Sequence, residues 1–137
     1  MEKIVLFGGA FDLLHAGHVR QISRARSYGD YLIINLSSDR QVSKKKGITR
    51  PIIPEEDRAE MLISLRDVDE VICPKTDELD LPYVLALTKP NVLVTNKGNN
   101  DYNKECKKRG IKLVKLSRCI PKSKLDTTEI ITKIKGG

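Results

Sequence analysis

Short apolar runs alternate with amphipathic stretches along the whole chain, and this alternation limits the fold more than any other feature. The first run is apolar and ends in glycine, as expected for a buried strand. Strands separated by helices, again and again, predict an α/β domain whose parallel sheet carries helices on both faces. The five predicted strands are Lys3–Gly8, Tyr31–Leu36, Val68–Ile72, Asn91–Thr95 and Lys112–Leu116.

Helices are predicted between these strands from apolar spacing and from start signals. A proline followed by three acidic residues is typical of a first helical turn, as is an oxygen cap with a carboxylate three residues on. The segment Lys44–Gly47 is expected to be a basic loop. The predicted helices are Gly17–Tyr28, one starting at Pro54, Leu79–Leu87, Asn103–Arg109 and one starting at Asp126.

The length of the chain fits one domain. Its 137 residues are enough to bury an ordinary core, so a single domain over residues 1–137 is expected. No apolar run approaches the roughly 20 residues that span a bilayer, and the N-terminus does not resemble a signal peptide. We therefore expect a cytoplasmic protein without a membrane partner.

Charge and composition narrow the classes of partner. The formal net charge of +7 favours polyanions, from a nucleoside triphosphate to nucleic acid. Only 4% of residues are aromatic and tryptophan is absent, which leaves little for base stacking and disfavours nucleic acid. Three cysteines without a C-x-x-C pair predict neither a disulfide framework nor a structural zinc site.

The segment Gly9–His18, which joins the first strand to the first helix, combines three features that suit an anion. Glycines let a ligand approach the backbone closely, and a helix N-terminus offers free N–H groups and a partial positive charge. His15 and His18 lie three residues apart at that terminus, and they are the two histidines of the chain. The sequence therefore predicts a phosphate site here.

Other interpretations of the same residues stay open. The histidines could be hydrogen-bonded structural residues, and H-x-x-H could offer two nitrogens to zinc. A third zinc ligand is not obvious beyond Asp12 or a distant cysteine, so no protein-held metal site is predicted. The chain has neither G-x-x-x-x-G-K-[ST] nor G-x-G-x-x-G, which argues against a P-loop and a dinucleotide-binding loop.

The string G-x-F-D-x-x-H-x-G-H resembles the signature of the cytidylyltransferase-like nucleotidyltransferase superfamily. This group includes glycerol-3-phosphate cytidylyltransferases, heptose-phosphate adenylyltransferases and archaeal-type FAD synthetases, and the heptose-phosphate enzymes look most similar. The resemblance covers essentially the whole chain. Besides the histidine string, it is carried by Ser38-Asp39, Lys46-Gly47, Arg50–Arg58, Val68–Ile72 and Thr127–Ile131.

The resemblance implies a Rossmann-like fold and an enzyme that transfers AMP or CMP from ATP or CTP to a phosphorylated metabolite. Glycerol phosphate, a sugar phosphate and FMN are all open as acceptors. A Mg²⁺ ion bridging the phosphates and a homodimer are also implied. The runner-up is a catalytically silent nucleotide- or RNA-binding module of the same fold. A substrate phosphate is already ionised near neutral pH, so the reaction needs alignment and charge neutralisation rather than a general base.

Site residues follow from the resemblance by position. The catalytic candidates are His15, His18 and Lys46, with Lys44 and Lys45 as alternatives to Lys46. The expected nucleotide-binding residues are Gly9, Ala10, Phe11, His15, Gly17, His18, Asn96, Thr127 and Thr128, and further candidates are Asp12, Arg58 and Arg118.

Three positions invite a specific interpretation. Arg58 could pair with Glu55 on a solvated helix face, or it could contact the nucleotide region, since arginine suits bidentate phosphate recognition. The loop Asn96–Asp101 departs from the glycine-containing turn of the family, and Asp126 stands where the family has serine. The loop departure bears on base and acceptor specificity. A carboxylate next to a triphosphate is repulsive, so Asp126 is expected to cap the last helix or to help place a metal.

Overall fold

The computed structural model describes residues 2–96, 100–116 and 127–135, except the side chains of 100 and 127–129. Within it, five parallel strands form one sheet in the order β3-β2-β1-β4-β5. The strands are β1 Ile4–Gly9, β2 Tyr31–Leu36, β3 Glu70–Ile72, β4 Val92–Thr95 and β5 Lys112–Lys115.

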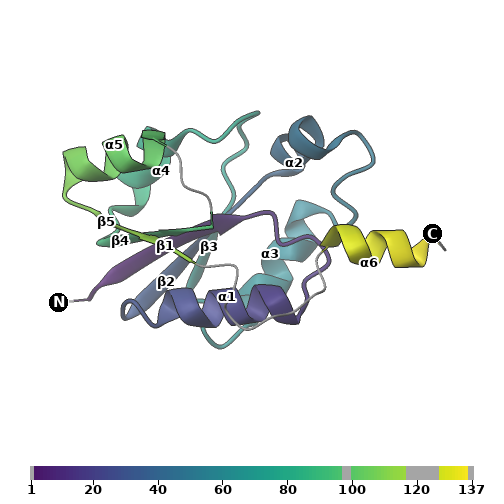
Figure 1. Ribbon diagram of the computed structural model, residues 1–137, viewed down its shortest axis with the longest axis horizontal. Coiled ribbons are helices and arrows are strands. Elements are labelled where there is room, and N and C mark those ends of the chain that lie inside the picture. The colour runs from purple at the N-terminus through teal and green to yellow at the C-terminus, as the bar shows by residue number, and fades with distance from the viewer. Residues whose placement is uncertain (1, 97–99, 117–126, 136–137) are drawn as a thin grey trace.

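Helices cover both faces of the sheet. Helices α1 and α3 lie below it and α4 and α5 above it in Figure 1, while α6 extends away from the sheet. None of the helices in the described part of the chain has the length and apolar character that a membrane span needs. The helices are α1 Ala16–Arg26, α2 Asp39–Lys46, α3 Glu55–Ile63, α4 Leu81–Thr88, α5 Asn100–Arg109 and α6 Thr127–Ile134.

The two-residue period of β1 divides the core into two clusters. Val5 and Phe7 face the cluster that contains Ile22 of α1 and Leu62 of α3. Leu6, between them, points to the opposite face and the cluster under α4 and α5. All three β1 side chains are buried, which explains why this strand is continuously apolar.

The α/β prediction is confirmed, and all five predicted strands exist with small differences at their ends. One predicted loop was wrong, because Lys44, Lys45 and Lys46 form the exposed last turn of helix α2. Ser38 starts this helix with a reciprocal cap: its hydroxyl accepts from the Gln41 N–H at 3.2 Å, and the Gln41 side chain accepts from the Ser38 N–H at 3.3 Å. Pro54, predicted as the first helical residue, instead stands just before α3 as its N-cap residue.

The strand order reverses at β1. Chain connections run from β1 outward to β2 and β3, and then return to β4 on the other side of β1 and continue to β5. Ligands of open parallel sheets bind outside the carboxyl ends of the strands at such a point. Gly9–His18 follows β1 and Asn96 follows β4, so both lie at this reversal.

Candidate active site

The two histidines form a reciprocal cap at the start of α1. The backbone N–H of Gly17 donates to Nδ1 of His15 at 3.0 Å, and the backbone N–H of His15 donates to Nδ1 of His18 at 3.2 Å. Because each Nδ1 accepts a hydrogen bond, a neutral ring carries its proton on Nε2. The cap therefore fixes both rings in the tautomer whose Nε2 is a donor.

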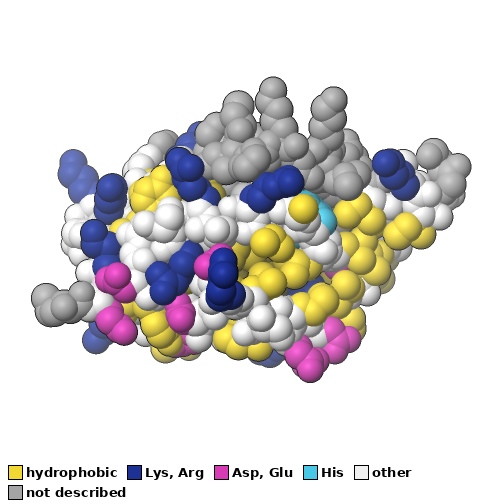
Figure 2. All heavy atoms as spheres, turned by 90° about the horizontal axis from the view of Figure 1, so that it is seen from below, with side chains coloured by type: hydrophobic (Ala, Val, Ile, Leu, Met, Phe, Trp, Pro, Cys, Tyr) yellow, Lys and Arg dark blue, Asp and Glu magenta, His cyan; other side chains and the backbone are white. Residues whose placement is uncertain are grey.

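The two rings stack on each other, and His18 also contacts a buried aromatic residue. Their centroids lie 3.8 Å apart with an interplanar angle of 25°, and the Phe11 ring meets His18 edge to face at 5.5 Å. Phe11 is buried against Phe7, with the ring centroids 5.7 Å apart. His18 is thus held by packing as well as by its hydrogen bond. Figure 2 shows histidine side-chain atoms reaching the surface beside hydrophobic side chains.

The pKa of His18 is lowered from 6.5 to about 4. Burial is the main cause, the neighbouring His15 adds to it, and the carboxylate of Asp12 opposes it. At neutral pH the imidazole is therefore an uncharged N–H donor. The Nε2 atom of His15 is enclosed by protein atoms, which makes His18 the better placed of the two to meet a ligand.

A pH dependence of stability follows from this pKa. In the unfolded chain His18 binds a proton near pH 6.5, whereas in the folded chain it does so near pH 4. The free energy of unfolding is therefore expected to fall as pH drops from 6.5 to 4, by about 1–3 kcal/mol for this group. Urea unfolding at pH 4, 5, 6 and 7 measures it. His18→Gln should remove this part of the pH dependence. If the free energy of unfolding falls equally with pH in the parent and in His18→Gln, the lowered pKa does not belong to His18.

The backbone before the cap is held in an unusual conformation. Phe11 and Leu13 have backbone φ angles of 49° and 50°, values that residues other than glycine rarely adopt. Such residues persist where the surroundings determine the backbone. Gly9 packs closely as well, since an added Cβ would lie 3.0 Å from the Phe11 ring. This tight turn directs the chain from β1 into α1.

The start of α1 is suited to an anion. Its first turn contains no acidic residue, whereas the first turn of α3 contains three. An unneutralised helix N-terminus carries a partial positive charge. Asn96 lies beside this helix, because its side-chain amide donates to the Gln21 side chain of α1 at 3.3 Å. Asn96 therefore contacts α1 about one helical turn after His18.

Asp12, which is part of the segment between β1 and α1, and Arg58 of α3 are both buried. Asp12 is 2% exposed, and its two oxygens accept the backbone N–H groups of Ile52 and Ile53 at 2.8 and 3.0 Å. Arg58 is 0% exposed and donates to the backbone carbonyl of Ala10 at 2.7 Å. The interpretation of Arg58 as a member of a solvated ion pair was wrong. Its guanidinium binds the segment through the Ala10 carbonyl, and it has no exposed atoms that could contact a nucleotide.

Other predicted residues lie apart from the histidines or outside the described residues. Lys46 is exposed at the end of α2, which Figure 1 shows on the other side of β1 from α1. Lys44, an alternative to Lys46, pairs with Glu78 at 2.8 Å. Arg118 and Asp126 lie outside the described residues, as do the side chains of Thr127 and Thr128, although both threonines begin α6.

Arg50 is a residue of this site that the sequence did not single out. Its Nε lies 3.5 Å from the Asp12 carboxylate, and its side chain is 15% exposed. Its place in the string Arg50–Arg58 was the available signal, but the string does not say what the arginine contacts. The structure shows that it is the cationic neighbour of a buried carboxylate.

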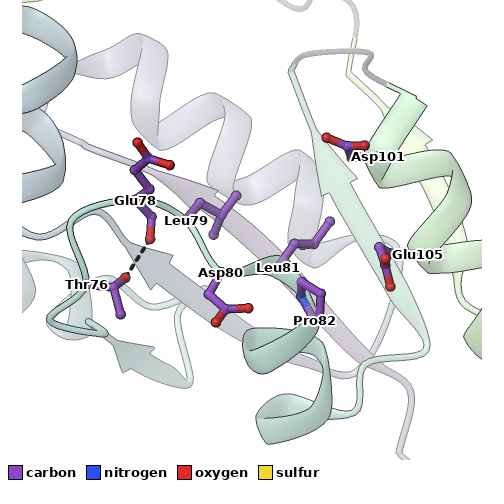
Figure 3. Close-up of a pocket in the computed structure, with 8 residues that line it drawn as sticks. All are labelled: Thr76, Glu78, Leu79, Asp80, Leu81, Pro82, Asp101 and Glu105. Carbon is purple, nitrogen blue, oxygen red and sulfur yellow. Dashed lines mark hydrogen bonds between the residues drawn. The ribbon is translucent and has the colours of Figure 1, made fainter.

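A shallow pocket of about 540 Å³ lies elsewhere, between the loop that leads into α4 and helix α5 (Figure 3). None of its lining residues belongs to Gly9–His18. Four of the eight carry carboxylates, which repel an anionic ligand. The pocket therefore does not suit a triphosphate or a phosphorylated metabolite. Its lining residues are Thr76, Glu78, Leu79, Asp80, Leu81, Pro82, Asp101 and Glu105.

Residues 6–133 match the family model described as cytidylyltransferase-like. The chain is 41% identical over 135 residues to the bifunctional protein HldE of Helicobacter pylori strain J99, covering 98% of this chain and 28% of that protein. It is 37% identical over 137 residues to the FAD synthase of Pyrococcus horikoshii, and the match covers 95% of this chain and 90% of that protein. The chain thus spans less than a third of the HldE proteins it matches.

A solved structure agrees with this match. The lipopolysaccharide core biosynthesis protein from Thermoplasma volcanium superposes with a TM-score of 0.73 at 25% sequence identity, covering 85% of this chain and 98% of that one. The resemblance identified from the histidine string is therefore confirmed at the level of the family. The chain belongs to the cytidylyltransferase-like nucleotidyltransferase family.

Proposed function

We propose that the protein transfers AMP or CMP from ATP or CTP to a phosphorylated small metabolite and releases pyrophosphate. The observation that carries this proposal is the reciprocal histidine cap. Two stacked imidazoles in a fixed tautomer stand at a helix N-terminus, at the point where the strand order reverses. The Nε2–H donor of His18, together with the partial positive charge of the helix N-terminus, suits a ligand with several phosphates.

The chemistry asks for charge neutralisation. The acceptor phosphate attacks the α-phosphorus of the nucleotide, a new P–O bond forms, and the bond to pyrophosphate breaks. Negative charge increases on the oxygens during this exchange. His18, neutral in the free protein, donates from Nε2, and an adjacent negative charge raises its pKa. The donor thus becomes more cationic as the charge develops, so it stabilises the transition state more than the ground state.

Lys46 would supply a mobile positive charge. It is at the exposed end of α2, next to Gly47, whose φ is 104° and whose Cβ position is open space. A long side chain in this setting can move towards a phosphate when a ligand arrives. We propose that Lys46 neutralises phosphate oxygens from the side opposite α1.

Mg²⁺ would be held by the nucleotide rather than by a built protein site. The described residues contain no group of three or more His, Cys, Asp or Glu side chains that could bind a metal. Both oxygens of Asp12, the acidic residue of the histidine string, accept backbone N–H groups. A divalent ion that bridges phosphates while keeping several waters needs few protein ligands.

Relatives suggest which acceptors to try first. The FAD synthase, which this chain covers over 90% of its length, is named for a product that contains AMP joined to FMN. We therefore propose ATP as the nucleotide and FMN as the first acceptor. The structural neighbour named for lipopolysaccharide core biosynthesis favours a sugar phosphate as the second. The homodimer implied by the family stays a prediction.

Pyrophosphate release tests the proposal. ATP and CTP are each incubated with FMN, a sugar 1-phosphate or glycerol 3-phosphate in the presence of Mg²⁺. Release is expected for one nucleotide and one acceptor class, and not without acceptor. Excess EDTA should stop it and added Mg²⁺ restore it. If no combination releases pyrophosphate and the protein instead binds RNA in a salt-sensitive way, the silent binding module is correct.

A further inference from the structure

The guanidinium of Arg58 joins three separate parts of the chain. It donates from Nε to the carbonyl of Ile53 at 2.8 Å, and from Nη1 to the carbonyls of Ala10 at 2.7 Å and Ser37 at 2.9 Å. Its Nη2 binds the Asp39 carboxylate at 2.8 Å. These acceptors belong to the segment after β1, the turn between β2 and α2 with the first residue of α2, and the segment before α3.

A buried guanidinium is costly unless its donors are satisfied. Arg58 is fully buried, and removal from water costs several kcal/mol for an ion. Here one carboxylate and three backbone carbonyls repay that cost. Carbonyls of loops can do so only if the loops stay where they are. The arginine therefore couples the positions of three loops to a single planar group, which lysine cannot replace because its donors have no fork geometry.

Helix α3 also fixes the start of α2 through a second residue. The Glu55 carboxylate accepts the backbone N–H of Asp39 at 2.8 Å and pairs with Lys75. Arg58 and Glu55 lie three residues apart on α3, so both project from the same side of the helix. The first turn of α3 thus holds Ala10 on one side and the first turn of α2 on the other.

We propose that Arg58 is a positioning residue that sets the distance between the histidine segment Gly9–His18 and helix α2 without touching substrate. The segment holds the imidazoles, and the last turn of α2 holds Lys46. Ala10 is followed by Phe11, whose ring packs against His18. Loss of the Ala10 anchor would therefore loosen the packing that keeps His18 away from water. Its effect on turnover rests on the proposed function, whereas its effect on His18 does not.

NMR titration of the histidines tests this role directly, because the chain has only two of them. In Arg58→Lys, the pKa of His18 should rise from about 4 towards 6.5 by at least about one pH unit, as solvation returns to a loosened ring. In the same variant kcat should be lower than in the parent protein by about 10-fold or more, with a smaller change in KM.

Arg26→Lys is the matched control. Arg26 also donates to a backbone carbonyl, that of Gly29 at 2.7 Å, and pairs with Asp69, but it lies at the opposite end of α1. This variant should leave the His18 pKa and kcat as in the parent. If Arg58→Lys is too unstable, trimethylamine N-oxide can restore the folded state without restoring the missing hydrogen bonds.

A folded Arg58→Lys protein with an unchanged His18 pKa would overturn the proposal, whether or not the protein shows activity. The residue would then serve stability alone. If Arg58→Lys raises the His18 pKa but the parent protein releases no pyrophosphate with any acceptor, the positioning role is supported and the proposed function is rejected. The two failures are thus separate.

Discussion

His18→Ala is expected to lower kcat by about 100-fold or more, the usual effect of losing one preorganised donor at a developing charge. The reason is the position of its Nε2. The ring is fixed by the hydrogen bond from the His15 N–H, by stacking on His15 and by the edge of Phe11. Single-turnover measurement of pyrophosphate release, at saturating nucleotide, gives the effect on the chemical step.

Two further variants separate catalysis from helix capping. His18→Asn keeps a side-chain oxygen near the position of Nδ1, so it can still accept from the His15 N–H. His18→Gln places an N–H donor nearer the position of Nε2. We expect His18→Asn to keep more stability than His18→Ala but to share its low kcat, and His18→Gln to recover part of kcat. Near-parental turnover in His18→Ala would remove His18 from the catalytic residues.

The central strands β1, β2 and β4 could be predicted because most of their side chains are buried, with helices on both faces of the sheet. Runs such as Leu32, Ile33 and Ile34 are apolar for a reason that acts locally at every residue, namely helices above and below the sheet. Helix α2 was missed because Val42 is its single buried residue, so it has no apolar periodicity. The cap formed by Ser38 and Gln41 was the available signal.

The geometry of the candidate site could be predicted only where its contacts are local. The cap between His15 and His18 spans three residues, and the histidine string is sufficient to locate it. By contrast, Arg58 meets the Ala10 carbonyl across 48 residues of sequence. Such a contact depends on the order of the strands and on the path of two loops. The residue pattern alone could therefore suggest an ion pair or a phosphate contact for Arg58, but not a buried support.

Asp12→Ala is expected to destabilise the folded protein by about 3–5 kcal/mol, the range for removing one partner from a buried charged pair. The substitution would leave the backbone N–H groups of Ile52 and Ile53 without their carboxylate acceptor and remove the anion 3.5 Å from Arg50 Nε. Urea unfolding at pH 7 measures the loss. Turnover should fall as well, since the hydrogen bonds from Ile52 and Ile53 to Asp12 also hold the turn that contains Phe11.

Asp12→Asn distinguishes this structural role of Asp12 from a role as a metal ligand. The amide has one oxygen, so it can accept from one of the two N–H groups, while its own N–H₂ would face the other donor. An intermediate loss of stability is therefore expected, with the variants ranked in the same order at low and high Mg²⁺. If Asp12 instead bound the metal, Asp12→Ala would unfold at the parental urea concentration and its activity would recover as Mg²⁺ increased. Both oxygens of Asp12 already accept backbone N–H groups, so we expect Asp12 to have the structural role and not to bind the metal.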